Sequence, residues 1–232
     1  MLDINKHKFF LVTLLKDIYN DTELATALGF KGGTAQMLFY GLPRFSVDLD
    51  FNLLAQEKSE TVFKKIRDIV SKYCNIRDEA EKYFGLLLLL DYGQQELNLK
   101  IEISNRKFPD RYEIKNFLGI AMKVMVKPDM FAHKLCALLD RKMLTNRDVF
   151  DVYYFLNQKT PINKTIVEER MNMSFEAYLD KCISRMKEIP SKRLLNGIGE
   201  LVDNNMKAFV KNKLKAETLQ MLKMYQEFPI ID

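Results

Sequence analysis

The sequence has no tryptophan, and among its 232 residues it has only two histidines, three cysteines, nine glycines and six prolines. So little glycine and proline excludes a collagen-like or low-complexity chain, and 47% hydrophobic residues are enough for a sizeable core. The cysteines, Cys74, Cys136 and Cys182, form no CxxC pair and no Cys/His cluster. We therefore expect neither a disulfide framework nor a zinc site, and we interpret the cysteines as buried thiols in a reducing cytoplasm.

Long apolar runs and a strong net charge are also missing. The longest apolar run, Leu86 to Leu90 with its flanks, fits a buried strand, because a membrane-spanning helix needs about 20 apolar residues. Polar residues interrupt Met1 to Ile18, unlike a signal peptide, so we expect a cytoplasmic protein that does not cross a membrane. The net charge of +5 permits a polyanionic partner but does not select one.

Two stretches carry residues suited to binding a nucleotide and its metal ion. Lys31-Gly32-Gly33-Thr34 places a glycine pair at the start of a predicted helix, where backbone N–H groups can approach phosphate. The predicted strand Val47 to Leu54 directs Asp48 and Asp50 to one face, and carboxylate oxygens are ligands that Mg²⁺ prefers. Two carboxylates at this spacing also occur on solvated sheet faces, but the glycine pair upstream favours a site.

Hydrophobic periodicity predicts helices around these stretches and an antiparallel hairpin in the middle of the chain. In the second hairpin strand, Leu97 to Ser104, Lys100 and Glu102 share the polar face. Residues 112–126 could add a further strand, and beyond Pro128 the chain is predicted to be almost entirely helical. The first hairpin strand is Leu86 to Tyr92, and the predicted helices are His7 to Tyr19, Glu23 to Leu28, Thr34 to Tyr40, Lys58 to Tyr73, Met130 to Arg141, Asp148 to Leu156, Ser174 to Lys187, Lys192 to Val210 and Lys213 to Tyr225.

The glycine pair and the two carboxylates resemble the first motif of the AbiEii/AbiGii nucleotidyltransferase-like toxins, a family of the DNA polymerase β-like nucleotidyltransferase superfamily. A lysine before the glycines and an Arg-x-Ser-x-Asp-Leu-Asp-Phe block make this family version more specific than the superfamily motif. The matching residues are Lys31 to Ala35, Tyr40, Leu42, Arg44, Ser46 and Asp48 to Phe51.

Two later segments support the resemblance. His133 to Arg141 is similar to the family's Lys-x-x-Ala-x-x-x-Arg helix, and Arg147 to Tyr153 is similar to its Arg-Asp-x-x-Asp motif. The resemblance covers roughly residues 25–158, and the helical tail beyond Thr160 matches none of the family motifs.

The resemblance implies an α+β fold in two regions. Residues 1–127 would form a nucleotidyltransferase-type mixed sheet flanked by helices, and residues 128–232 a mostly helical region that completes the active site and packs on the core. The implied activity is transfer of a nucleoside monophosphate from an NTP to an acceptor, dependent on Mg²⁺ or Mn²⁺. RNA, in particular tRNA, is the first choice of acceptor and a protein hydroxyl the second.

The implied biological setting is the toxin half of a bacterial toxin–antitoxin or phage abortive-infection system, with a cognate antitoxin protein as a candidate partner. Asp48, Asp50 and Glu102 would bind the metal ions, although the family more often has Asp where this chain has Glu102. Lys134 and Asp148 would join them as catalytic residues. The residues expected to bind the nucleotide are Lys31, Gly32, Gly33, Thr34, Arg44, Ser46 and Arg141.

Several of these residues have structural explanations as well. Lys134 could extend along the edge of a packed helix, in which Arg141 would share its face. Asp148 ends a Thr145 to Asp148 capping box, which would satisfy the first N–H groups of a helix. Arg147 and Asp151 are four residues apart and could pair with each other.

Two other functions stay open for the chain as a whole. One is a non-catalytic nucleotide- or RNA-binding module of the same fold, and the other is a nucleotidyl- or phosphotransferase that modifies a small molecule. The two carboxylates and the glycine pair favour an enzyme over a binding module, because a binding module does not need two metal carboxylates.

Overall fold

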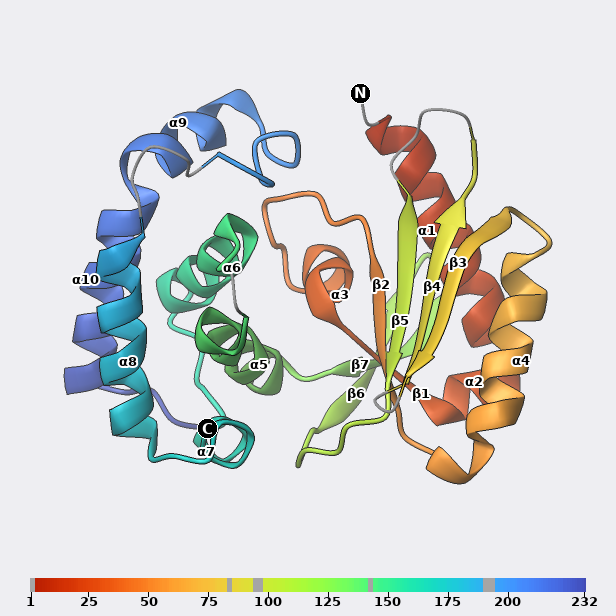
Figure 1. Ribbon diagram of the computed structural model, residues 1–232, viewed down its shortest axis with the longest axis horizontal. Helices are drawn as coiled ribbons and strands as arrows, with labels where there is room; N and C mark the ends of the chain where they lie inside the picture. The colour runs from red at the N-terminus through yellow and green to blue at the C-terminus, as the bar shows by residue number, and fades with distance from the viewer. Residues whose placement is uncertain (1–2, 83–84, 94–97, 142–143, 190–194) are drawn as a thin grey trace. The chain divides into compact units, whose positions relative to one another are not determined.

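The computed structural model describes residues 3–82, 85–93, 98–141, 144–189 and 195–232 (Figure 1). The chain forms two compact units. Unit 1 comprises Met1–Gly41, Phe45–Lys107 and Tyr112–Met125, and unit 2 comprises Leu42–Arg44, Phe108–Arg111 and Val126–Asp232. Two short segments in the first half of the chain therefore belong with the helices of unit 2.

Unit 1 is built on a seven-stranded mixed sheet with the strand order β3-β4-β5-β2-β1-β7-β6. The pairs β2–β5 and β1–β7 are parallel, and the remaining neighbours are antiparallel. The strands are β1 (Leu28–Lys31), β2 (Leu49–Leu53), β3 (Asn75–Lys82), β4 (Gly85–Asp91), β5 (Leu99–Ser104), β6 (Tyr112–Phe117) and β7 (Ile120–Met125).

The helices of unit 1 cover both faces of this sheet. Figure 1 shows α1 (Ile4–Asn20), α2 (Thr22–Ala27) and α4 (Ser59–Val70) on one face and α3 (Gly32–Phe39) on the other. The apolar residues of β2 alternate along the strand: Leu49 and Phe51 are fully buried, and the Phe51 ring lies 6.4 Å from that of Tyr19 in α1. The alternation therefore directs the neighbouring Asp48 and Asp50 to the opposite face.

Unit 2 is helical. Its helices are α5 (Lys127–Asp140), α6 (Asn146–Asn157), α7 (Lys164–Met171), α8 (Phe175–Glu188), α9 (Asn204–Asn212) and α10 (Leu214–Glu227). Pro128 occupies the first turn of α5, and the rings of Phe131 and Phe155 stack 5.2 Å apart between α5 and α6. None of the helices in the described ranges is long and apolar enough to span a membrane.

The predicted α+β class with a mixed sheet is confirmed, and residues 112–126 form the β6–β7 hairpin. Four elements of the described residues were not predicted: β1, β3, α7 and the short 3-10 helix η1 (Gln56–Lys58). The predicted helix Lys192 to Val210 is wrong in its first part, because residues 195–202 form turns and bends and α9 begins at Asn204, where the Asp203 side chain caps it. Cys74 is only partly buried, unlike Cys136 and Cys182, and both Leu97 and Lys192 lie outside the described residues.

Candidate functional site

Charged side chains meet on one face of the sheet in unit 1. Asp50 on β2 is the register partner of Glu102 on the parallel strand β5, and it is also the partner of Lys31 on the antiparallel strand β1. Because register partners share a face, Lys31, Asp50 and Glu102 form one row across neighbouring strands. Asp48 and Lys100 precede Asp50 and Glu102 by two residues and lie on the same face. We call this set the carboxylate face.

Lys100 is the counter-charge of the carboxylate face. Its Nζ lies 3.1 Å from Oε2 of Glu102. Burial alone would lower the pKa of Lys100, but Asp50, Glu102 and Asp48 raise it above its ordinary value. Burial would raise the pKa of Glu102, but Lys100 and Lys31 bring it below its usual range. Lys100 and Glu102 therefore form a charged pair on this face at neutral pH, and the sequence did not reveal this role of Lys100.

Gly32 allows the start of α3 to approach Asp50. Its φ is +80°, a conformation that favours glycine, and a Cβ at this position would lie 2.2 Å from Oδ2 of Asp50. Lys31 caps α3 without a side-chain hydrogen bond. The side chain of the N-cap residue therefore does not cap the first N–H groups of α3. Helix starts of this kind bind phosphate in other proteins.

Thr34 and Ser46 shape the approach to β2. The Thr34 side chain is fully buried, and its hydroxyl donates to the backbone carbonyl of Asp48 at 2.5 Å. The hydroxyl of Thr34 therefore holds protein backbone, and the predicted contact of this residue with phosphate stays a prediction. Ser46 is also buried, with 6% of its surface exposed.

The carboxylate face is not a preformed three-ligand metal site. Within the described part of the chain, no three His, Cys, Asp or Glu side chains come close enough together to hold a metal ion. The expected third ligand, Glu102, is paired with Lys100 instead. The Asp50 carboxylate lies against the start of α3 at Gly32. Asp48 and Asp50 together still suit Mg²⁺, which is commonly held by one or two carboxylates together with water and phosphate oxygens.

Unit 2 contains a buried cluster of charges around Asp151. Arg44 approaches this carboxylate through two nitrogens, each 2.6 Å from one oxygen, and Nζ of Lys134 lies 2.7 Å from Oδ2. The Asp151 side chain is fully buried, and 17% of the Lys134 side chain is exposed. Burial would raise the pKa of Asp151, but Arg44 and Lys134 hold it below its ordinary value. The suggested pair of Asp151 with Arg147 is wrong, and the forked donors of Arg44 bind this carboxylate.

Asp148 and Arg141 form a second ion pair in unit 2. The Nε of Arg141 lies 3.0 Å from Oδ2 of Asp148, and the same oxygen accepts a hydrogen bond from the Thr145 hydroxyl at 2.5 Å. Thr145 in turn accepts from the Asp148 N–H at 3.3 Å and caps α6, as the capping alternative predicted. Arg141 follows the end of α5 in an extended conformation, so the expected stripe of Lys134 and Arg141 on one helix does not exist.

The predicted site residues are divided between the two units. The prediction that the helical region completes the active site concerns the relation of the units and stays a prediction. Lys100 and Asp151 belong to these charged clusters but were not among the predicted site residues. The polar strand face was the signal for Lys100, and the Arg-Asp-x-x-Asp motif was the signal for Asp151. Unit 1 holds Lys31, Gly32, Gly33, Thr34, Ser46, Asp48, Asp50 and Glu102, and unit 2 holds Arg44, Lys134, Arg141 and Asp148.

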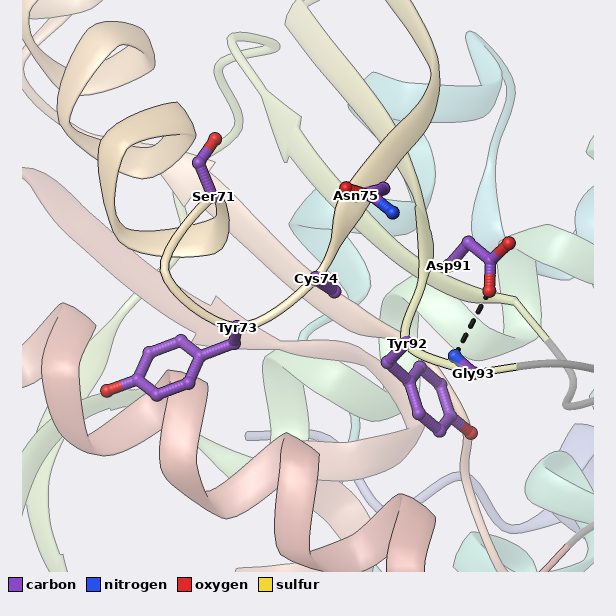
Figure 2. A pocket seen from close by; sticks show the side chains of 7 residues that line it. All are labelled: Ser71, Tyr73, Cys74, Asn75, Asp91, Tyr92 and Gly93. Carbon is purple, nitrogen blue, oxygen red and sulfur yellow. Dashed lines mark hydrogen bonds between the residues drawn. The ribbon is translucent and has the colours of Figure 1, made fainter.

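Two of the cavities among the described residues are lined by other side chains. The cavity of unit 1, about 490 Å³, lies where α4 leads into β3 and β4 ends, and Figure 2 shows Tyr73, Cys74, Asp91 and Tyr92 around it. The cavity of unit 2, about 390 Å³, lies between α6 and the start of α9 and has several aromatic side chains in its wall. None of the predicted site residues lines either cavity.

The mixed sheet and the carboxylate face define a protein of the nucleotidyltransferase fold class, and solved structures agree. JHP933 from Helicobacter pylori is similar with a TM-score of 0.57 and 21% identity, covering 98% of this chain and 94% of that chain. A second H. pylori structure, provisionally described as a nucleotidyltransferase, has the same TM-score and identity and covers 96% of this chain and 94% of that chain. At this identity the likeness shows the fold alone.

The family follows from the sequence. The family model described as "Nucleotidyl transferase AbiEii toxin, Type IV TA system" matches residues 13–229. The chain therefore belongs to the AbiEii family of nucleotidyl transferase toxins of type IV toxin–antitoxin systems. The match confirms the resemblance and extends it through the helical tail that the motifs left unassigned. No curated protein matches the chain.

Proposed function

We propose that this protein transfers a nucleoside monophosphate from an NTP to a hydroxyl of RNA with the help of a divalent cation. The observation that carries the proposal is the carboxylate face, in which Asp48 and Asp50 lie on the same face as the glycine start of α3. In the reaction, the acceptor oxygen bonds to the α-phosphorus, the bond to the β-phosphate oxygen breaks and pyrophosphate leaves. The hydroxyl proton is released to solvent.

The residues of unit 1 would divide this task. A divalent cation at Asp48 and Asp50 would supply positive charge for the phosphate oxygens and the leaving group. The N–H groups at the start of α3 would donate to the phosphate, and the absent side chain of Gly32 lets the start of α3 lie against Asp50. Lys100 offsets the repulsion among the carboxylates, and the pairing of Lys100 with Glu102 leaves Asp48 and Asp50 as the principal ligands.

For unit 2 we propose separate roles for the two ion pairs. Arg44 and Lys134 together exceed the charge of Asp151 by one positive charge, and the partly exposed Lys134 can offer this charge to a triphosphate. Asp148 is almost fully buried, with donors from Thr145 and Arg141, so we assign it to capping α6 and not to catalysis.

The cavity of unit 2 supports RNA as the acceptor. The partly exposed rings of Tyr153 and Phe209 line it, and unpaired RNA bases stack on such rings. Amide groups of Asn157 and Asn205 lie at the same cavity and can bond to base edges. A protein hydroxyl would have no use for a stacking wall, so the cavity favours RNA over the second choice of acceptor.

The test is incubation of the full chain with Mg²⁺, total RNA and an NTP labelled at either the α- or the γ-phosphate. We expect the α-label in RNA, and we expect the Asp50→Ala variant to lose this transfer while it stays folded. Transfer of the γ-label would instead indicate phosphotransfer, and RNA binding without label transfer would indicate a binding module. Undiminished transfer by folded Asp50→Ala protein would refute the metal role of the carboxylate face.

A further inference from the structure

A buried histidine of α1 holds the backbone next to Asp48. His7 is fully buried. Its Nε2 lies 2.8 Å from the carbonyl oxygen of Val47, and its Nδ1 lies 2.5 Å from the hydroxyl of Tyr92. A buried imidazole is unfavourable unless both nitrogens are bonded, and here both are.

These partners fix which nitrogen carries the proton. A carbonyl oxygen can only accept a hydrogen bond, so Nε2 of His7 must donate to Val47. In the neutral ring, Nδ1 is then an acceptor, and the Tyr92 hydroxyl donates to it. The rings of Phe45 and Tyr92 meet the imidazole edge-on at 5.7 and 5.5 Å, which restricts its rotation.

Two successive carbonyl groups are held in this way. The Val47 carbonyl is bonded to His7 of α1, and the Asp48 carbonyl is bonded to Thr34 of α3. The pairing of β2 with β5 begins only at Leu49, so the strand ladder does not position these two residues. Side chains of two helices therefore fix the backbone from which the Asp48 carboxylate projects.

We propose that His7 is a positioning residue for Asp48, held in its Nε2–H form by the Val47 carbonyl, while Tyr92 bonds to the other ring nitrogen. The inference rests on the proposed function in one respect, namely that Asp48 binds the divalent cation. His7 does not touch the reacting groups. It acts through the Val47 carbonyl, in the way that bonded neighbours orient metal ligands in other proteins.

A matched pair of substitutions separates this role from packing. The His7→Gln variant places an amide N–H near the position of Nε2 and can still donate to Val47, whereas the His7→Asn amide corresponds to Nδ1 and cannot reach. We expect His7→Asn to lower kcat for RNA labelling and affinity for Mn²⁺ alone by about tenfold or more. His7→Gln should recover most of both, and the melting temperature of each variant reports folding. Equal losses in the two variants, or unchanged Mn²⁺ affinity in His7→Asn, would overturn the proposal.

Nitrogen NMR of the histidines gives a readout that does not depend on activity. The chain has only two histidines, so ¹⁵N-histidine labelling with a His133→Gln reference assigns the His7 ring. We expect a proton on Nε2 and none on Nδ1 in the full-length protein. The Tyr92→Phe variant removes the partner of Nδ1 and leaves the Val47 carbonyl on Nε2, so we expect the proton to stay on Nε2 and the Mn²⁺ affinity to be intermediate.

The possible results distinguish the two proposals. A proton on Nδ1 of His7 in the wild-type protein would refute the positioning role whatever the activity. Normal Mn²⁺ binding without RNA labelling would refute the proposed acceptor and leave the His7 inference supported by the variants. A wild-type chain that binds no Mn²⁺ would refute both.

Discussion

Replacing Gly32 by alanine tests the geometry of the carboxylate face most directly. The substitution adds one methyl group to a residue whose φ is +80°, and the new Cβ would lie 2.2 Å from Oδ2 of Asp50. Two effects follow from one change. The backbone conformation becomes strained, and the Asp50 carboxylate has to move.

The two effects can be separated because the chain offers a matched control. Gly119, in the β6–β7 turn, has a φ of +82°, and a Cβ there would meet nothing within 4 Å. We expect Gly119→Ala to lower the free energy of unfolding by about 1–2 kcal/mol, the cost of a left-handed conformation in a residue with a side chain. Gly32→Ala should lose the same amount and a further ~1–3 kcal/mol from overpacking against Asp50.

The Gly32→Ala and Gly119→Ala variants should differ more in activity than in stability. Displacement of a reacting group by about 1 Å can lower a rate by about a hundredfold, so we expect at least that loss of RNA labelling in Gly32→Ala and little loss in Gly119→Ala. Urea unfolding and the labelling assay, run on both variants, provide the measurements. Equal stability and equal RNA labelling in the Gly32→Ala and Gly119→Ala variants would show that Asp50 does not lie against the start of α3.

Three further variants test unit 2. Asp151→Asn would leave the charges of Arg44 and Lys134 without their carboxylate, and urea unfolding should show a loss of about 3–5 kcal/mol. Because the folded-state pKa of Asp151 is lowered, its stabilisation is fully present above about pH 4 and is lost as the pH falls through the folded-state pKa, so the wild-type and variant curves should converge in acid. Lys134→Ala should raise the KM for NTP about tenfold, because one ionic contact of about 1.4 kcal/mol is lost. The substitution Lys164→Ala, at an exposed lysine, serves as the control. An unchanged KM in Lys134→Ala would show that Lys134 serves packing and not NTP binding. Phe209→Ala should raise the KM for RNA but not for NTP, since one stacked base contributes about 1–3 kcal/mol, and the exposed Phe228→Ala should change neither; equal effects of the two substitutions would exclude the cavity as a base site.

The ligands of the site could be predicted from the sequence because they lie in short, regular patterns. Alternation along β2 was enough to place Asp48 and Asp50 on one face, since Leu49 and Phe51 between and after them had to be buried. Strand β1 was missed because it is only four residues long and contains Gly29, which normally weakens a strand. That glycine leaves room for a distant residue: a Cβ at Gly29 would lie 2.2 Å from the Tyr112 ring on β6.

The groups that hold the ligands could not be predicted, because their partners are remote in the sequence. His7 and Lys100 occupy ordinary polar positions on a helix and a strand. Their roles follow from the contacts of His7 with Val47 and Tyr92 and from the charge of Asp50 near Lys100, and only folding brings these residues together. Lys134 and Arg44 illustrate the same limit, since a basic residue in a motif suggests a phosphate, while in unit 2 both contact Asp151. A motif therefore identifies the groups that can do the chemistry, and the long-range contacts decide which of them are held in place for it. Variants of the two kinds should fail differently: loss of a ligand should abolish transfer, and loss of a holding residue should weaken it to a degree that a matched donor such as glutamine at His7 can reverse.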